Sequence, residues 1–115
     1  MKDSEQLFIE AFNWQRDENF EINKAHGFEE PDDFNFGEKV ALTHGELSEA
    51  LEWYRKGNPA SDHISNFSGV EEEFADTIIR IMNISKRLNL RVAEAMLAKQ
   101  KYNAARPYKH GGKKC

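Results

Sequence analysis

Cysteine is almost absent from this chain, since Cys115 is the only one among 115 residues and cannot form a disulfide within the chain. Long apolar runs are absent too, because none approaches the roughly 18 residues that a membrane-spanning helix needs. The first residues, MKDSEQLF, also lack the basic and then apolar segment of a secretion signal. We therefore expect a cytoplasmic protein with no membrane partner.

An excess of positive charge is also missing. Lysine and arginine number 16 against 20 acidic residues, and the net charge of −4 gives no general footprint for a nucleic acid polymer. A small charged metabolite is easier to accommodate, provided that cations meet it. A convincing alternation of apolar and polar residues is absent as well, which excludes a sheet. The length suits a single domain over residues 1–115.

Helical periodicity is present almost throughout the chain. Capping residues, glycine and proline divide it into four predicted helices. The predicted helices cover residues 3–24, 37–56, 69–88 and 91–105. We expect an all-α, four-helix bundle, with the glycine- and lysine-rich tail 107–115 flexible.

The apolar residues of the second and third predicted helices define the expected core. These side chains are Val40, Leu47, Ala50, Leu51 and Tyr54 in the second helix, and Val70, Phe74, Ile78, Ile81 and Ile84 or Ser85 in the third. The third helix is apolar over enough of its circumference to need cover from more than one side. One short chain has little core to spare, so we expect a homodimer or homotetramer with sites near the subunit interfaces.

Two pairs of acids stand beside these apolar faces. Glu46 and Glu49 are three residues apart, as are Glu73 and Asp76, so each pair lies on one side of its helix. Two such helices side by side would place four carboxylates in a small volume, where cations or protons must neutralise them. Hard oxygen ligands without cysteine or histidine suit Mg²⁺ or Mn²⁺. The alternative is that these acids only face solvent.

The ordered motifs resemble those of a known family. Glu46-x-x-Glu49, a gap of 23 residues and Glu73-x-x-Asp76 are similar to the acid motifs of the MazG-like, all-α nucleoside triphosphate pyrophosphohydrolases. The segments GELSEALEWYRKG, EEEFADTIIRI and KQKYNAARPYKHGGK resemble consecutive blocks of the small, stand-alone bacterial and phage members. The resemblance implies a MazG-like bundle that hydrolyses a nucleoside triphosphate between the α- and β-phosphates.

The resemblance also implies roles for individual residues. Glu46, Glu49, Glu73 and Asp76 would be the catalytic acids that hold Mg²⁺ or Mn²⁺, with one of the first pair orienting the attacking water instead. Leu42 and Thr43 stand where relatives often carry further glutamates, which leaves the number of metal ions open.

The expected substrate contacts lie around these acids. Lys99 and Asn103 resemble a Lys-x-x-x-Asn motif of the family, and with Arg106 they would meet the outer phosphates. Trp53 would stack on the base or only pack under the loop, and Asn13 would help to form the base pocket. Arg80 follows Asp76 by four residues and either binds substrate or holds that carboxylate in an ion pair.

The sequence leaves the nucleotide open; a purine deoxynucleotide such as dGTP suits this architecture. A rival from another class is a non-catalytic helical dimerisation or nucleotide-binding module, which would show the same amphipathic helices and a charged groove. It would not need acids on inward-facing lines or a Lys-x-x-x-Asn motif after them. A di-iron carboxylate bundle would need Glu-x-x-His pairs, which are absent from the sequence.

Overall fold

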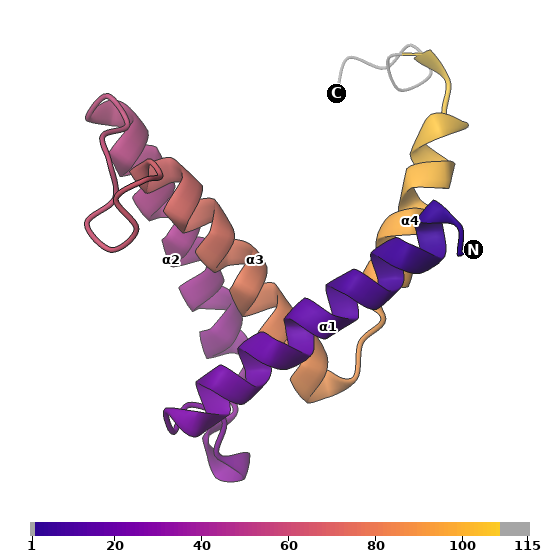
Figure 1. Cartoon of the computed structure of the whole chain (residues 1–115), viewed down its shortest axis with the longest axis horizontal. Coiled ribbons are helices and arrows are strands. Elements are labelled where there is room, and N and C mark those ends of the chain that lie inside the picture. The colour runs from indigo at the N-terminus through magenta and orange to yellow at the C-terminus, as the bar shows by residue number, and fades with distance from the viewer. Residues whose placement is uncertain (1, 109–115) are drawn as a thin grey trace.

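Helices make up most of the computed structural model, which describes residues 2–108 (Figure 1). In chain order they are α1 (Ser4–Ala25), the short 3₁₀ helix η1 (Pro31–Asp33), α2 (Phe36–Arg55), α3 (Gly69–Leu88) and α4 (Val92–Ala104). Within residues 2–108 the only β-type pairing is an isolated antiparallel bridge between Ala60 and Ser68. The all-α prediction is therefore confirmed. Part of the tail predicted to be flexible, residues 109–115, lies outside the described residues.

The predicted helix bounds agree with the observed ones to within one residue, and the caps explain why. Asp3 accepts a hydrogen bond from the backbone of Gln6 at 2.8 Å and starts α1. Ser68 and Glu71 form a reciprocal capping box at the start of α3. At its other end α3 stops at Asn89, whose φ of 55° is left-handed and cannot continue a helix.

The helices form two arms, as Figure 1 shows. One arm is the antiparallel hairpin of α2 and α3, which pack side by side. The other arm holds α1 and α4, and α1 crosses α3 near Met82, whose sulfur lies 3.8 Å from the amide nitrogen of Asn19. Arg87 of α3 fixes the connection between α1 and α2 by donating to the carbonyl oxygens of Glu30 and Pro31. No helix among the described residues is long and apolar enough to cross a bilayer.

The predicted core was largely wrong for the single chain. Only Ala50 of the second helix and Ser85 of the third are buried as predicted, and Val40, Val70 and Ile84 are half-buried. The larger apolar side chains expected inside are exposed: Leu47, Leu51, Tyr54, Phe74, Ile78 and Ile81. The two helices pack side by side, and most of the residues buried along them are small or polar, such as Ala50 and Thr77. The neighbouring apolar stripe of each helix is therefore left exposed.

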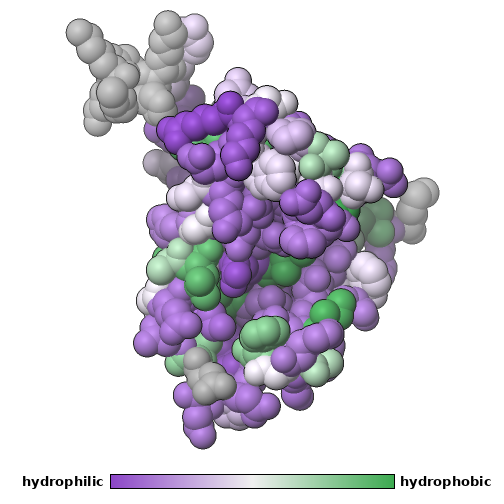
Figure 2. Space-filling view, turned by 90° about the vertical axis from the view of Figure 1, so that its left-hand side faces the viewer, coloured by the Kyte–Doolittle hydropathy of each residue, from purple (hydrophilic) through white to green (hydrophobic). Residues whose placement is uncertain are grey.

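These six exposed side chains form what we call the apolar face of the hairpin. Viewed down each helix from its N-terminus, these apolar residues lie on one side of the buried position, Ala50 in α2 or Thr77 in α3, and the acids lie on the other side. The sense of rotation is the same in both helices, so in an antiparallel pair the two apolar stripes lie on one face of the hairpin and the acids on the opposite face. Hydrophobic patches are also visible among hydrophilic residues on the side of the molecule in Figure 2.

The surface of the chain is large for its mass. Its accessible area is 8833 Å², whereas a folded monomer of this mass exposes about 6,500 Å². Its radius of gyration is 17.0 Å, against roughly 13 Å for a compact domain of this length. The only buried hydrophobic side chains in the described part are Ala50, Met82 and Ala93. The four helices therefore do not close around a full core within one chain.

Candidate metal centre

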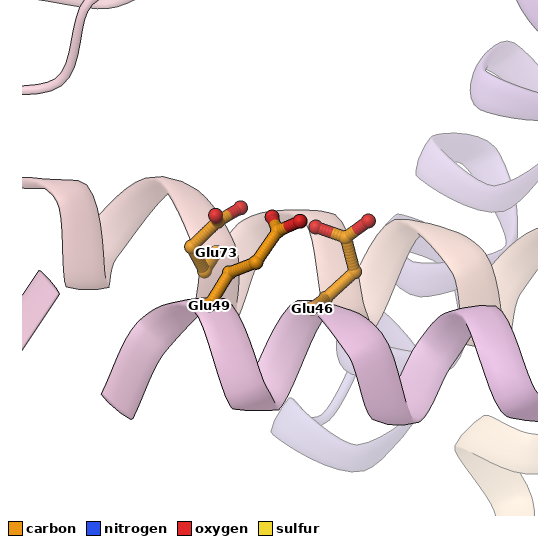
Figure 3. A group of neighbouring side chains, drawn as sticks. All are labelled: Glu46, Glu49 and Glu73. Carbon is orange, nitrogen blue, oxygen red and sulfur yellow. The ribbon is translucent and has the colours of Figure 1, made fainter. Parts of the chain in front are cut away.

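Three carboxylates converge on the side of the hairpin opposite the apolar face. Glu46 and Glu49 of α2 and Glu73 of α3 each place one oxygen within 4.8 Å of the others (Figure 3). Asp76 lies one helical turn beyond Glu73 and lines the same pocket, which has a volume of about 430 Å³. The two acid pairs predicted from sequence are thus brought together. We call this space the acid pocket.

Glu73 is the buried member of the group, with only 6% of its surface exposed. Burial is the largest of the effects that raise its pKa to about 8, and the neighbouring Glu49 and Glu46 add to it. Burial, followed by the charges of Glu46 and Glu72, also raises the pKa of Asp76. Glu73 therefore holds a proton near neutral pH unless a cation replaces it.

The donor set fits a hard divalent cation. Carboxylate oxygens from two facing helices are ligands that Mg²⁺ and Mn²⁺ accept, and no sulfur or imidazole belongs to the three-residue group. Thr43, one turn before Glu46, donates its hydroxyl to the carbonyl oxygen of Lys39 at 2.8 Å. Its side chain is thus tied to its own helix.

Arg80 borders the acid pocket through an ion pair. Its Nε donates to Oε1 of Glu46 at 3.1 Å, so the arginine of α3 forms its ion pair with Glu46 of α2. Its charge also acts on Asp76, where it opposes the rise in pKa that burial causes. The sequence predicted that Arg80 either binds substrate or pairs with Asp76. In the structure Arg80 does form an ion pair, but its partner is Glu46. A cation bound by Glu46 would compete with this pair for the carboxylate.

Trp53 lines the acid pocket at the end where α2 finishes. Its indole packs on Gly69 so closely that a β-carbon there would come within 2.0 Å of a ring atom. The Nζ of Lys56 lies 5.8 Å from the centre of the same ring. Trp53 is thus fixed against the backbone of α3, and its predicted stacking on a base stays a prediction.

The other predicted substrate contacts do not reach the acid pocket in this chain. Lys99, Asn103 and Arg106 belong to α4 or follow it, on the other arm of the molecule (Figure 1). Lys99 and Asn103 line a separate shallow hollow with Val92 and Met96, and Lys99 lies over the ring of Tyr102. Asn13 is half-buried in α1 and is not part of the pocket lining. The chain alone therefore brings together the acids, Arg80 and Trp53.

Sequence reasoning missed several residues of the pocket wall. The residues that it missed are Glu52 of α2, Glu72 of α3, and Lys56, Asp62 and His63 of the connection between the two helices. Helical spacing could have placed two of them, because Glu52 follows Glu49 by three residues and Lys56 follows Trp53 by three residues. The course of the connection, residues 56–68, gave no comparable signal.

Comparisons of the chain with protein-family models, with curated proteins and with solved structures found no match. Function must therefore be inferred from the residues and their arrangement.

The raised pKa of Glu73 leads to a first prediction, on stability without metal. Between pH 4.5, the ordinary pKa, and about 8, the folded chain holds a proton that the unfolded chain has lost. The contribution of Glu73 to the free energy of unfolding is fully present below pH 4.5. It is lost as the pH rises to about 8, at up to about 1.4 kcal/mol per pH unit. In a chelator, the melting temperature should fall from pH 5.5 to 8. A melting temperature that rises over this interval would contradict the assignment.

Proposed function

We propose that this protein is a metal-dependent nucleoside triphosphate pyrophosphohydrolase of the MazG-like type, with Mg²⁺ or Mn²⁺ as cofactor. The observation that carries the proposal is the meeting of three carboxylates from two facing helices within 4.8 Å, one of them buried. Such a group is unfavourable by itself, since Glu49 and Glu46 add to the effect of burial in raising the pKa of Glu73. The order and spacing of the acid motifs supply the reaction class. The proposed substrate is a purine deoxynucleotide such as dGTP.

The residues of the pocket divide the proposed work between them. Glu46, Glu49, Glu73 and Asp76 would hold the cations, and one of the first pair would orient the attacking water. Bound divalent cations would offset the charge of the triphosphate and lower the pKa of that water. The hairpin fixes the acids on two rigid helices, so their positions need no rearrangement when the substrate enters.

A second copy of the chain is part of the proposal. The predicted phosphate contacts Lys99, Asn103 and Arg106 lie on the arm away from the acids, so we infer that they approach the acid pocket of another copy. The apolar face and the excess of exposed surface, on the order of 2,000 Å², support assembly of the chain. An area of this size per chain is typical of obligate homodimers. The proposed enzyme is therefore a homodimer or homotetramer.

A second prediction is that metal stabilises the folded protein and that nucleotide, added after the metal, stabilises it further. Adding millimolar Mn²⁺ or Mg²⁺ at pH 7.5 should raise the melting temperature, because the cation replaces protons among the acids. A non-hydrolysable triphosphate should raise it further, and only when the metal is present. Scanning calorimetry or dye-based melting measures both steps. A non-catalytic dimerisation module would show neither step.

The bond that breaks is a third prediction. Attack on the α-phosphorus makes pyrophosphate the leaving group and places the oxygen of water in the monophosphate. In ¹⁸O-labelled water, mass spectrometry should find the label in the nucleoside monophosphate. Label only in pyrophosphate would indicate attack on the β-phosphorus, and release of phosphate with a nucleoside diphosphate would contradict the reaction class.

A further inference from the structure

The connection between α2 and α3, residues 56–68, forms one wall of the acid pocket and is firmly held. Within it Ala60 and Ser68 form the antiparallel bridge, and the backbone nitrogen of Ser61 donates to the carbonyl oxygen of Phe67 at 2.8 Å. Ser61 is only 2% exposed. Its hydroxyl accepts from the backbone nitrogens of His63 and Ile64 and donates to Glu72 of α3. The wall is therefore fixed to the helix that carries Glu73.

His63 is the outermost member of this hydrogen-bond chain. Its Nδ1 lies 2.8 Å from Oε2 of Glu72, while 81% of its side chain remains exposed. When Nδ1 donates to the carboxylate, Nε2 is the ring nitrogen left for a molecule in the pocket. The hydrogen bond with Glu72 raises the pKa of His63, and the charges of Glu72, Asp62 and Asp76 add to this effect. The ring is thus fixed by one nitrogen and can act as a cation.

The charges that line the pocket are distributed unevenly. Of the lining side chains, Lys56 and His63 are the two that can carry a positive charge, and both belong to the connection between α2 and α3. At the other end, beyond Glu46, the positive charge of Arg80 is already paired with that acid. Acids such as Asp62 also line this part of the pocket, but it is the part that holds the lysine and the histidine. Electrostatic repulsion of a bound anion is therefore weakest beside Lys56 and His63.

We propose that His63 and Lys56 bind the outer phosphates of the triphosphate, and that the nucleoside extends toward Arg80. This orientation rests on the proposed function, because the reacting α-phosphate must lie near the acids that hold the cations. It places the β- and γ-phosphates against the connection between α2 and α3. It also places Trp53 beside the phosphates, so that its indole serves as a wall fixed on Gly69 and does not stack on the base.

Binding of the two products separately tests this orientation. Titration calorimetry with Mn²⁺ present would compare inorganic pyrophosphate and dGMP as probes for the wild type and His63→Ala. Loss of a charge-assisted hydrogen bond should weaken pyrophosphate binding about tenfold or more. The affinity for dGMP and for Mn²⁺ alone should stay within twofold. The matched control is Asp62→Asn, which removes a negative charge from the same wall and should bind pyrophosphate as tightly as the wild type or more tightly.

A second measurement reports on the ring itself. In ¹⁵N–¹H spectra of the histidine rings, pyrophosphate with Mg²⁺ should shift the Nε2 signal of His63, and dGMP should not. The proposed orientation would be overturned if His63→Ala bound pyrophosphate as the wild type does, or if it lost affinity for dGMP instead. In that case the wild type would still hydrolyse triphosphates, and the proposed function would stand. A wild-type protein that binds Mn²⁺ but hydrolyses no triphosphate would instead overturn the proposed function.

Discussion

Glutamine in place of Glu73 is expected to abolish triphosphate hydrolysis and to make the metal-free protein more stable. The substitution removes a proposed cation ligand, which should lower kcat at least about 100-fold. It also removes the buried carboxyl whose pKa is raised to about 8, and with it the repulsion from Glu46 and Glu49. The metal-free melting temperature at pH 8 should rise by several degrees, since about 1 kcal/mol corresponds to roughly 4–8 °C in a small domain.

The controls for Glu73→Gln separate the site from general charge effects. Glu21→Gln, at an exposed glutamate of α1, should change neither turnover nor melting temperature. Glu49→Gln and Asp76→Asn should lose activity as Glu73→Gln does. Near-normal turnover by Glu73→Gln would refute the assignment of the acid pocket as the metal centre. If Glu73→Gln melted at a lower temperature than the wild type in chelator, the conclusion that the buried Glu73 carboxyl destabilises the metal-free protein at pH 8 would be wrong.

The largest effect on assembly is expected from the apolar face. Light scattering at micromolar concentration should give a multiple of the chain mass of 13.3 kDa, with two or four copies. Leu47→Glu places a charge among the exposed apolar side chains, and burying it unpaired in an interface would cost several kcal/mol. This variant should dissociate to a species of one chain mass, with loss of activity because the α4 cations no longer reach the acids.

Ser48→Glu is the matched control for Leu47→Glu. The two positions are adjacent in α2, but they point about 100° apart around the helix axis. Ser48 is exposed and is not one of the six side chains that form the apolar face. The control should therefore assemble as the wild type does. A wild-type protein of one chain mass, or an assembled Leu47→Glu protein, would exclude this face as the interface.

The helices and the meeting of the acids could be predicted from sequence because local rules determine them. Caps at Asp3 and Ser68 start helices wherever they lie in the fold, so the predicted bounds were accurate. The spacing of three residues put each acid pair on one side of its helix, and the hairpin brought the pairs together.

The rest depends on contacts between distant parts of the chain. Periodicity separates an apolar stripe from an acidic one, but it does not say which side of a helix meets its neighbour. Here Ala50 and Thr77 are buried, and the larger apolar side chains are exposed. The place of α4 depends on its packing against α1, and His63 reaches the pocket only because Ser61 folds the connection onto Glu72. None of these contacts has a local pattern.

Gly69 determines how near α2 and α3 can come at the end of the acid pocket. A β-carbon at this position would lie inside the van der Waals radius of the Trp53 indole, so any larger residue must push the two helices apart or displace the ring. Glu73 lies one turn further along the same helix, opposite Glu49. The separation of the two helices beside the acid pocket is thus set by a residue that has no side chain, and a larger residue at position 69 that pushed the helices apart would widen the space between Glu49 and Glu73.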